Sequence, residues 1–75
     1  MKSNFNYKML KRYRQDLGMS QENFLFEIGK FGLRITRETL RAWETGKTSP
    51  TAKDLATIIQ FFGKPIYTFF NKGVK

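Results

Sequence analysis

The chain has 75 residues, and its 14 Lys and Arg against 6 Asp and Glu give a formal net charge of +8, which favours a polyanionic partner, nucleic acid before an anionic membrane surface. This length allows one domain, in which eight Phe, three Tyr and one Trp can fill a small core, and a short chain without covalent staples favours an all-α fold. Because Cys and His are both absent, disulfides and thiolate metal sites are excluded, zinc, haem and histidine-dependent acid/base chemistry are nearly excluded, and we expect no cofactor.

The first predicted helix follows a basic arm at residues 1–5 that we expect to be flexible. Asn4 or Asn6 can cap this helix, which runs to about Leu17, and Gly18 ends it. One face is expected to be buried, with four residues at the i, i+3, i+4, i+7 spacing of a helix: Leu10, Tyr13, Arg14 and Leu17. Arg14 is the exception on this face, because a guanidinium among apolar side chains needs a polar partner.

The second predicted helix begins after Ser20, whose hydroxyl is a good N-cap, and it buries Phe24, Leu25 and Ile28. Its end has two interpretations. The helix either stops at Gly29, or continues through Phe31, three residues beyond Ile28, and ends at Gly32. In both cases residues 32–35 connect it to the next helix.

The third predicted helix lies between a Thr36 cap and a Gly46 stop. Leu40 and Trp43 form one narrow apolar stripe toward the core. The long polar side chains of the first two turns point away from that stripe: Arg37, Glu38 and Arg41. This pattern suits a helix that enters a groove, and it equally suits any short surface helix.

The remaining segment predicts two further helices and a frayed tail at residues 72–75. Ser49 or Thr51 caps the fourth helix, which runs to about Phe62 and has a buried stripe of Leu55, Ile58, Ile59 and Phe62. Pro65 starts the fifth, from Ile66 to about Asn71, with Ile66, Phe69 and Phe70 apolar. We therefore expect a single domain over residues 1–75, with its core at about 6–71.

Two classes of protein are disfavoured by what the sequence lacks. No apolar run approaches the length of a membrane span, and the first residues lack the apolar stretch of a signal peptide, so we expect a cytoplasmic protein. No nucleophile–base pair and no suitably spaced carboxylate pair is visible, so we do not expect an enzyme.

Three segments match one family motif in order and spacing. They are Ser20-Gln21-x-x-Phe24, then Ile35-Thr36-x-x-Thr39-Leu40-x-x-Trp43-Glu44-Thr45-Gly46-x-x-x-Pro50, and then Phe62-Gly63-x-x-Ile66-x-x-Phe69-Phe70. Over residues 8–71 the chain strongly resembles the Cro/C1/XRE family of helix-turn-helix DNA-binding proteins. The resemblance implies a five-helix, lambda-repressor-like domain that binds double-stranded DNA as a transcriptional regulator, a repressor acting by occupancy, with helix 36–45 in the major groove.

The resemblance also assigns roles to single residues. The base-contacting positions are Arg37, Glu38, Arg41 and Ala42, and the backbone-contacting positions are Gln21, Thr36, Thr45 and Lys47. Arginine can donate two bonds to the O6 and N7 edge of guanine, and glutamate can accept from the amino group of cytosine. For Glu38 the alternative is a favourable interaction with the helix N-terminus, or an ion pair that orients Arg41 or Arg34.

The odd Arg14 is explained by the same resemblance, because Arg14 and Glu44 match a paired Arg and Glu that tie the first helix to the end of the third. A bidentate arginine–carboxylate pair would satisfy a guanidinium on an apolar face. We therefore predict a partly buried Arg14–Glu44 ion pair whose role is orientation more than net stability.

The chain departs from the family between its second and third helices. Leu25 stands where the family usually has Ala, and the connector before Ile35 is longer than the family's tight turn. This would tilt the third helix or prolong the second, and it would bring Lys30 and Arg34 close to DNA phosphates. Lys8, Lys11 and Arg12 could also neutralise phosphates, and for each lysine the alternative is a solvated surface charge.

Two kinds of protein partner are compatible with the apolar C-terminal segment. It could form the two-fold contact of a homodimer, at least on DNA, as related repressors do. Alternatively the fold could serve as an antitoxin or adaptor that holds a protein partner.

Overall fold

The computed structural model describes residues 5–70, which form four α-helices followed by a short 3-10 helix. In chain order these are α1 (Tyr7–Asp16), α2 (Gln21–Gly29), α3 (Arg37–Thr45), α4 (Ala52–Phe62) and η1 (Ile66–Phe69). Within this range there is no strand beyond an isolated antiparallel bridge between Phe5 and Phe70. None of the helices in this range is both long enough and apolar enough to span a membrane.

Side-chain hydroxyls cap three of the four α-helices. The Ser20, Thr36 and Thr51 oxygens accept from the backbone N–H three residues later, at 3.1, 3.1 and 3.2 Å. Each bond satisfies one of the free donors of the first helical turn. Asn6 occupies the N-cap position of α1 but makes no side-chain capping bond.

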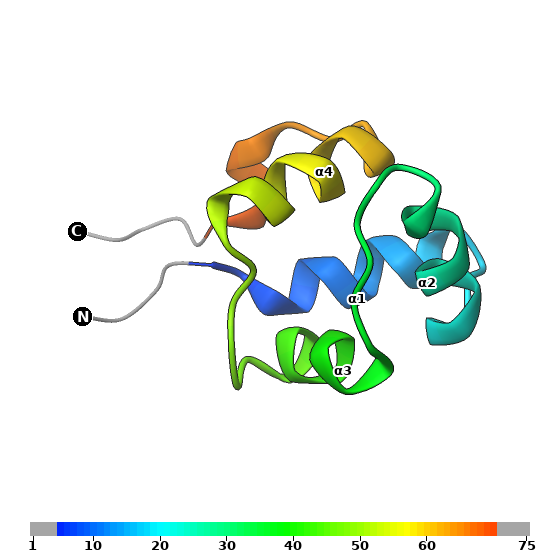
Figure 1. The fold of residues 1–75 in the computed structure, drawn as a ribbon. Helices are drawn as coiled ribbons and strands as arrows, with labels where there is room; N and C mark the ends of the chain where they lie inside the picture. Colours follow the sequence, from blue (N-terminus) through cyan, green and yellow to red (C-terminus); the bar gives the residue numbers. More distant parts are fainter. Residues whose placement is uncertain (1–4, 71–75) are drawn as a thin grey trace.

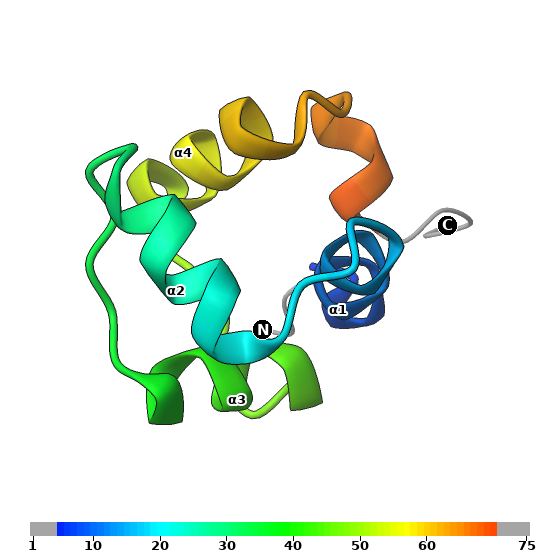
Figure 2. The same ribbon diagram turned by 90° about the vertical axis from the view of Figure 1, so that its right-hand side faces the viewer.

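The helices surround one core, and in Figure 1 α1 lies between α3 below it and α4 and η1 above it. Viewed along α1, α2 runs from the side of α3 toward the side of α4 (Figure 2). The core consists of ten buried apolar residues: Phe5, Leu10, Phe24, Ile28, Leu33, Leu40, Trp43, Leu55, Ile58 and Phe69. Leu40 and Trp43 thus hold the inner side of α3 in the core, as their spacing predicts.

A chain of aromatic contacts joins the other helices. Phe62 of α4 lies against Phe24 of α2 and Tyr13 of α1, each with a ring-centroid distance of 5.7 Å. Tyr13 also meets Phe69 of η1 edge-on, at 5.3 Å. Offset and edge-to-face ring pairs stabilise packing beyond their buried area, so few residues suffice to close this small core.

The structure corrects several expectations at the ends of elements. Phe5, expected in a flexible arm, is buried and bridges to Phe70, whereas residues 1–4 and the tail lie outside the described residues. The expected fifth α-helix is the 3-10 helix η1, in which the apolar Ile66 is 55% exposed. Leu17, expected on the buried face of α1, is also 55% exposed, because α1 ends at Asp16 and the chain turns away at Leu17.

The connector between α2 and α3 is ordered by one apolar side chain. α2 ends at Gly29, so it is not prolonged, and the chain reverses through Gly32, whose φ is +98°. Leu33 then enters the core, and its N–H bonds to the Ile28 carbonyl at 3.3 Å. Phe31, which would extend the buried stripe if α2 continued past Gly29, is half exposed and touches Phe61 of α4.

Candidate nucleic-acid interface

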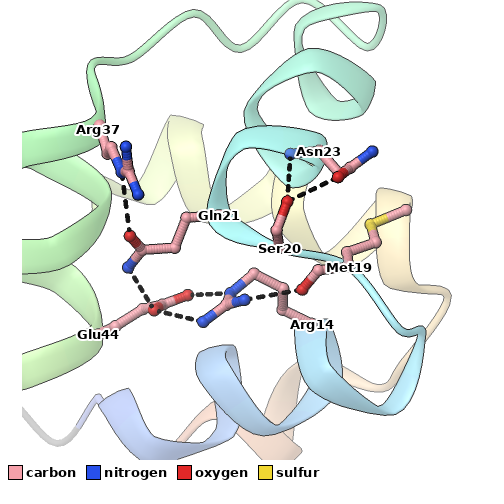
Figure 3. A network of polar contacts seen from close by, with 7 residues as sticks. All are labelled: Arg14, Met19, Ser20, Gln21, Asn23, Arg37 and Glu44. Atoms are coloured by element: carbon pink, nitrogen blue, oxygen red, sulfur yellow. Dashed lines mark hydrogen bonds and ion pairs between the residues drawn. The ribbon is translucent and has the colours of Figure 1, made fainter.

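A buried ion pair joins α1 to the last turn of α3, as the sequence predicts. Arg14 Nε donates to Glu44 Oε2 at 2.7 Å, and its Nη2 donates to Oε1 at 3.0 Å (Figure 3). The third nitrogen, Nη1, donates to the backbone carbonyl of Met19 at 2.8 Å. Both charged residues are only 6% exposed, and this bidentate arrangement satisfies each of them. The end of α3 is therefore held at a fixed position against α1.

Gln21 extends this network from Glu44 to the start of α3. Its Nε2 donates to Glu44 Oε1 at 3.1 Å, and its Oε1 accepts from Arg37 Nε at 3.4 Å. Gln21 thus bonds to residues at both ends of α3, Arg37 in its first turn and the buried Glu44 in its last (Figure 3). An amide nitrogen has two hydrogens, so one N–H of Gln21 remains available to an external acceptor such as a phosphate.

The outer face of α3 carries exposed polar side chains around a shallow cavity of about 570 Å³, lined by Glu38, Arg41, Ala42, Thr45 and Lys47. We call this surface the α3 face. Within residues 5–70, neither Glu38 nor Arg41 has a side-chain hydrogen bond or an ion pair, so Glu38 does not orient Arg41 or Arg34 here. The donors of Arg41 and the acceptors of Glu38 are therefore available to a ligand.

The two threonines of the predicted site are already engaged. The Thr36 hydroxyl accepts from the Thr39 N–H and lies 3.0 Å from the Thr39 hydroxyl. The Thr45 hydroxyl donates to the carbonyl of Arg41 at 2.9 Å, one turn earlier in α3. Each hydroxyl oxygen can still accept, but a bond donated by Thr45 to a phosphate would replace the one to Arg41.

Lys30 and Arg34 do not join the α3 face. Lys30 pairs with Glu27 at 3.4 Å and its ammonium lies 4.7 Å from the ring centre of Phe26. The Arg34 guanidinium reaches back to the end of α2, where its Nη1 would lie 4.0 Å from a Cβ added to Gly29. This end of α2 lies on the α4 side of the molecule, whereas its first residues lie beside α3 (Figure 2).

Sequence patterns missed the contact that fixes the turn after α3. Gly46 has φ +83°, and a Cβ added there would lie 2.7 Å from Cε1 of the Tyr7 ring. The sequence predicts the glycine as a helix stop, but the close approach of a ring from 39 positions earlier (46 − 7) depends on how α1 crosses α3. Tyr7 therefore helps to place the turn that carries Lys47.

The chemistry of this surface is polar and basic. Arg37, Arg41 and Lys47 supply exposed donors, while Glu38 supplies the acceptor. No group of three His, Cys, Asp or Glu residues that could hold a metal occurs in the described part of the chain. Such a set of side chains can bind phosphates and the polar edges of bases.

Comparisons with known proteins match this architecture. A model of the helix-turn-helix family matches residues 10–69. Type II methyltransferase M.SsoII of Shigella sonnei is 38% identical over 60 residues, a match that covers 77% of this chain and 15% of that protein. The chain thus spans a small part of the curated relative's length, and no solved structure matches it. Because the family model covers most of the chain and the Arg14–Glu44 pair, the caps and α3 are all in place, the chain belongs to the Cro/C1-type (XRE) family of helix-turn-helix DNA-binding proteins.

Proposed function

We propose that the chain is a sequence-specific regulator of transcription that binds double-stranded DNA with α3 in the major groove and represses by occupying its site. One observation carries this proposal. The inner side of α3 is fixed by Leu40, Trp43 and the buried Glu44, while Glu38 and Arg41 on its outer side are exposed and unpaired. Rigid positioning of free donors and acceptors is what contact with base edges requires.

The first test is the salt dependence of binding to duplex DNA. Each phosphate neutralised by a cation releases counterions, so log K should fall with log salt with a slope of about −0.9 per contact. Phosphate contacts by Lys47, together with any others, therefore predict a steep slope in a fluorescence-anisotropy titration. A slope near zero between about 50 and 200 mM salt would contradict DNA binding altogether.

Arg41→Ala and Lys47→Ala should weaken binding in different ways. Arg41 lies on the α3 face and is expected to bond to a base, so its loss should relax the preference at one base pair by about 1–3 kcal/mol. Lys47 follows α3 and is expected to contact phosphate, so its loss should weaken binding to all sequences alike. Binding to a pool of single-base variants of the preferred site measures both effects. Uniform weakening by both variants would refute the assignment of Arg41.

The same proposal includes a homodimer on DNA. An apolar cavity of about 490 Å³ lies between α4 and η1, and its lining includes Phe5, Pro50, Leu55, Ile59, Ile66 and Phe70. Ile66, which lines this cavity, and the next residue, Tyr67, are 55% and 71% exposed, which suits a self-complementary two-fold contact. Half-sites one helical turn apart would then be occupied together.

Ile66→Lys should abolish this cooperativity, because a charge in an apolar two-fold contact is buried without a partner. Sedimentation of the protein with DNA that carries two half-sites should show two chains bound together for the wild type and independent binding for the variant. Leu17→Lys is the matched control, since Leu17 is equally exposed but lies at the end of α1. Equal cooperativity in all three proteins would refute the contact.

A second candidate function uses the same apolar cavity for a different protein partner, as in an antitoxin or adaptor. The exposed Ile66 and Tyr67 favour it, and a stoichiometric complex with a neighbouring gene product that requires Ile66 would support it. We assign no catalytic step to the chain itself.

A further inference from the structure

A second groove, outside the α3 face, lies between α1 and the last turn of α3. It has a volume of about 650 Å³, and its lining includes Lys8, Lys11, Arg12, Asp16 and Thr45. We call it the α1 groove. Glu44 also lies in its lining, but that carboxylate is already bound by Arg14 and Gln21.

The three cations of this groove are arranged to attract an anion. Lys8, Lys11 and Arg12 fall at i, i+3 and i+4, so they share one face of α1, and all three are exposed. Within residues 5–70 none of them has an ion pair or a side-chain hydrogen bond. Like charges at this spacing destabilise a helix by about 0.2–0.5 kcal/mol per pair, and a bound polyanion would relieve that repulsion.

The α1 groove adjoins the α3 face, because Thr45 lines both cavities. The cations of α1 therefore lie next to the surface that carries Arg41, Ala42 and Lys47. A nucleic-acid strand that borders the major groove beside the end of α3 would pass close to α1. This adjacency favours DNA over an acidic peptide as the occupant.

We propose that the α1 groove binds phosphates of the DNA strand that flanks the bases contacted by α3. This inference rests on the proposed function and adds to it a second row of backbone contacts, from Lys8, Lys11 and Arg12. Such contacts raise affinity and set the position of the domain on the duplex, but they carry no base information. The footprint of the protein then extends beyond the contacts of α2, α3 and the turn at Lys47.

The test compares two double variants that lower the net charge equally. Lys8→Ala/Lys11→Ala removes two cations of the groove, whereas Lys53→Ala/Lys64→Ala removes two exposed cations from the start of α4 and the turn after it. The groove variant should lower the steepness of the salt slope by about 1.8, twice the value for one phosphate, and leave the preferred base sequence unchanged. The control variant should retain the wild-type slope, and circular dichroism should show both folded.

Each other outcome has a distinct meaning. A flat slope for the wild type overturns the proposed function itself. If the wild type has a steep slope and the groove variant retains it, only the proposal for the α1 groove is overturned. The same holds if both double variants lose the same amount of slope, because that would be an effect of net charge alone. Loss of binding to a poly-glutamate peptide without loss of DNA slope would assign the groove to an acidic protein instead. If the double variant does not fold, Arg12→Ala replaces it, with an expected change in slope of about 0.9.

Discussion

Glu44→Gln should lower the free energy of unfolding by about 3–5 kcal/mol, the usual cost of removing one partner of a buried ion pair. The carboxylate of Glu44 accepts two bonds from Arg14 and one from Gln21, and both charged residues are 6% exposed. A neutral amide leaves the Arg14 guanidinium buried without a counter-charge. A domain of this length has a total stability of only about 4–11 kcal/mol, so the variant should be largely unfolded at modest urea concentrations.

The double variant Arg14→Met/Glu44→Leu should be more stable than Glu44→Gln alone. Its apolar side chains fill a similar volume and bury no charge, and such replacements are often neutral or stabilising. The resulting protein should nonetheless bind DNA more weakly, because the polar contacts that join the end of α3 to Arg14 and Gln21 are lost. Urea unfolding monitored by circular dichroism measures the stabilities. If Glu44→Gln costs less than about 1 kcal/mol, or if the double variant is the less stable of the two, the pair does not have this role.

Gly46→Ala should cost about 2–6 kcal/mol, as the sum of two effects. A non-glycine residue in the left-handed region costs about 1–3 kcal/mol, and overlap with a packed neighbour typically adds about 1–3 kcal/mol. Gly46 has φ +83°, and its new methyl group would lie 2.7 and 2.8 Å from two carbons of the Tyr7 ring. The ring must move, and the turn between α3 and α4 must move with it.

Gly18→Ala separates the two effects. Gly18 also has a positive φ, of +71°, but a Cβ there would meet nothing within 4 Å. It should therefore cost about 1–3 kcal/mol, the backbone strain alone. In a Tyr7→Ala background, the cost of Gly46→Ala should fall to a similar value. Thermal unfolding of the wild type, Tyr7→Ala, Gly46→Ala and the double variant gives the double-mutant cycle that measures this. Equal costs for Gly18→Ala and Gly46→Ala in the native background would show that the Tyr7 contact has no energetic weight.

Features with a local cause could be predicted from the sequence. Ser20 and Thr36 cap their helices, and Gly46 ends α3 in the left-handed region. Each depends on a few neighbouring residues, so pattern and chemistry suffice. The long-range Arg14–Glu44 pair could be predicted because an arginine on an apolar helix face demands a partner and the family resemblance supplied one.

Features that depend on tertiary packing could not be predicted from the sequence. Phe5 precedes the first helix and has no periodic pattern around it, yet it is buried because it pairs with Phe70 and stacks near Phe69. Phe31 continues a helical stripe in the sequence, but Gly32 reverses the chain and Leu33 takes the core position. These outcomes depend on where distant elements lie, which spacing along the chain does not encode.

In the candidate site, too, some placements could be predicted from local spacing and others could not. The outward direction of Glu38 and Arg41 follows from the inward direction of Leu40, so helical spacing alone predicts it. The placement of Lys30 and Arg34 cannot be predicted from helical spacing, because it depends on how the connector between α2 and α3 folds. In the structure their side chains lie at the far end of α2, outside the α3 face.

Selection from a pool of random duplex DNA, followed by sequencing, tests the central claim most directly. The wild type should enrich one short motif with a guanine at a position whose preference disappears in Arg41→Ala, because arginine is the donor that best matches the guanine edge. If a folded wild type retains DNA but enriches no motif, α3 does not contact bases and the protein binds only the backbone. That result would contradict the assignment of this chain as a sequence-specific regulator.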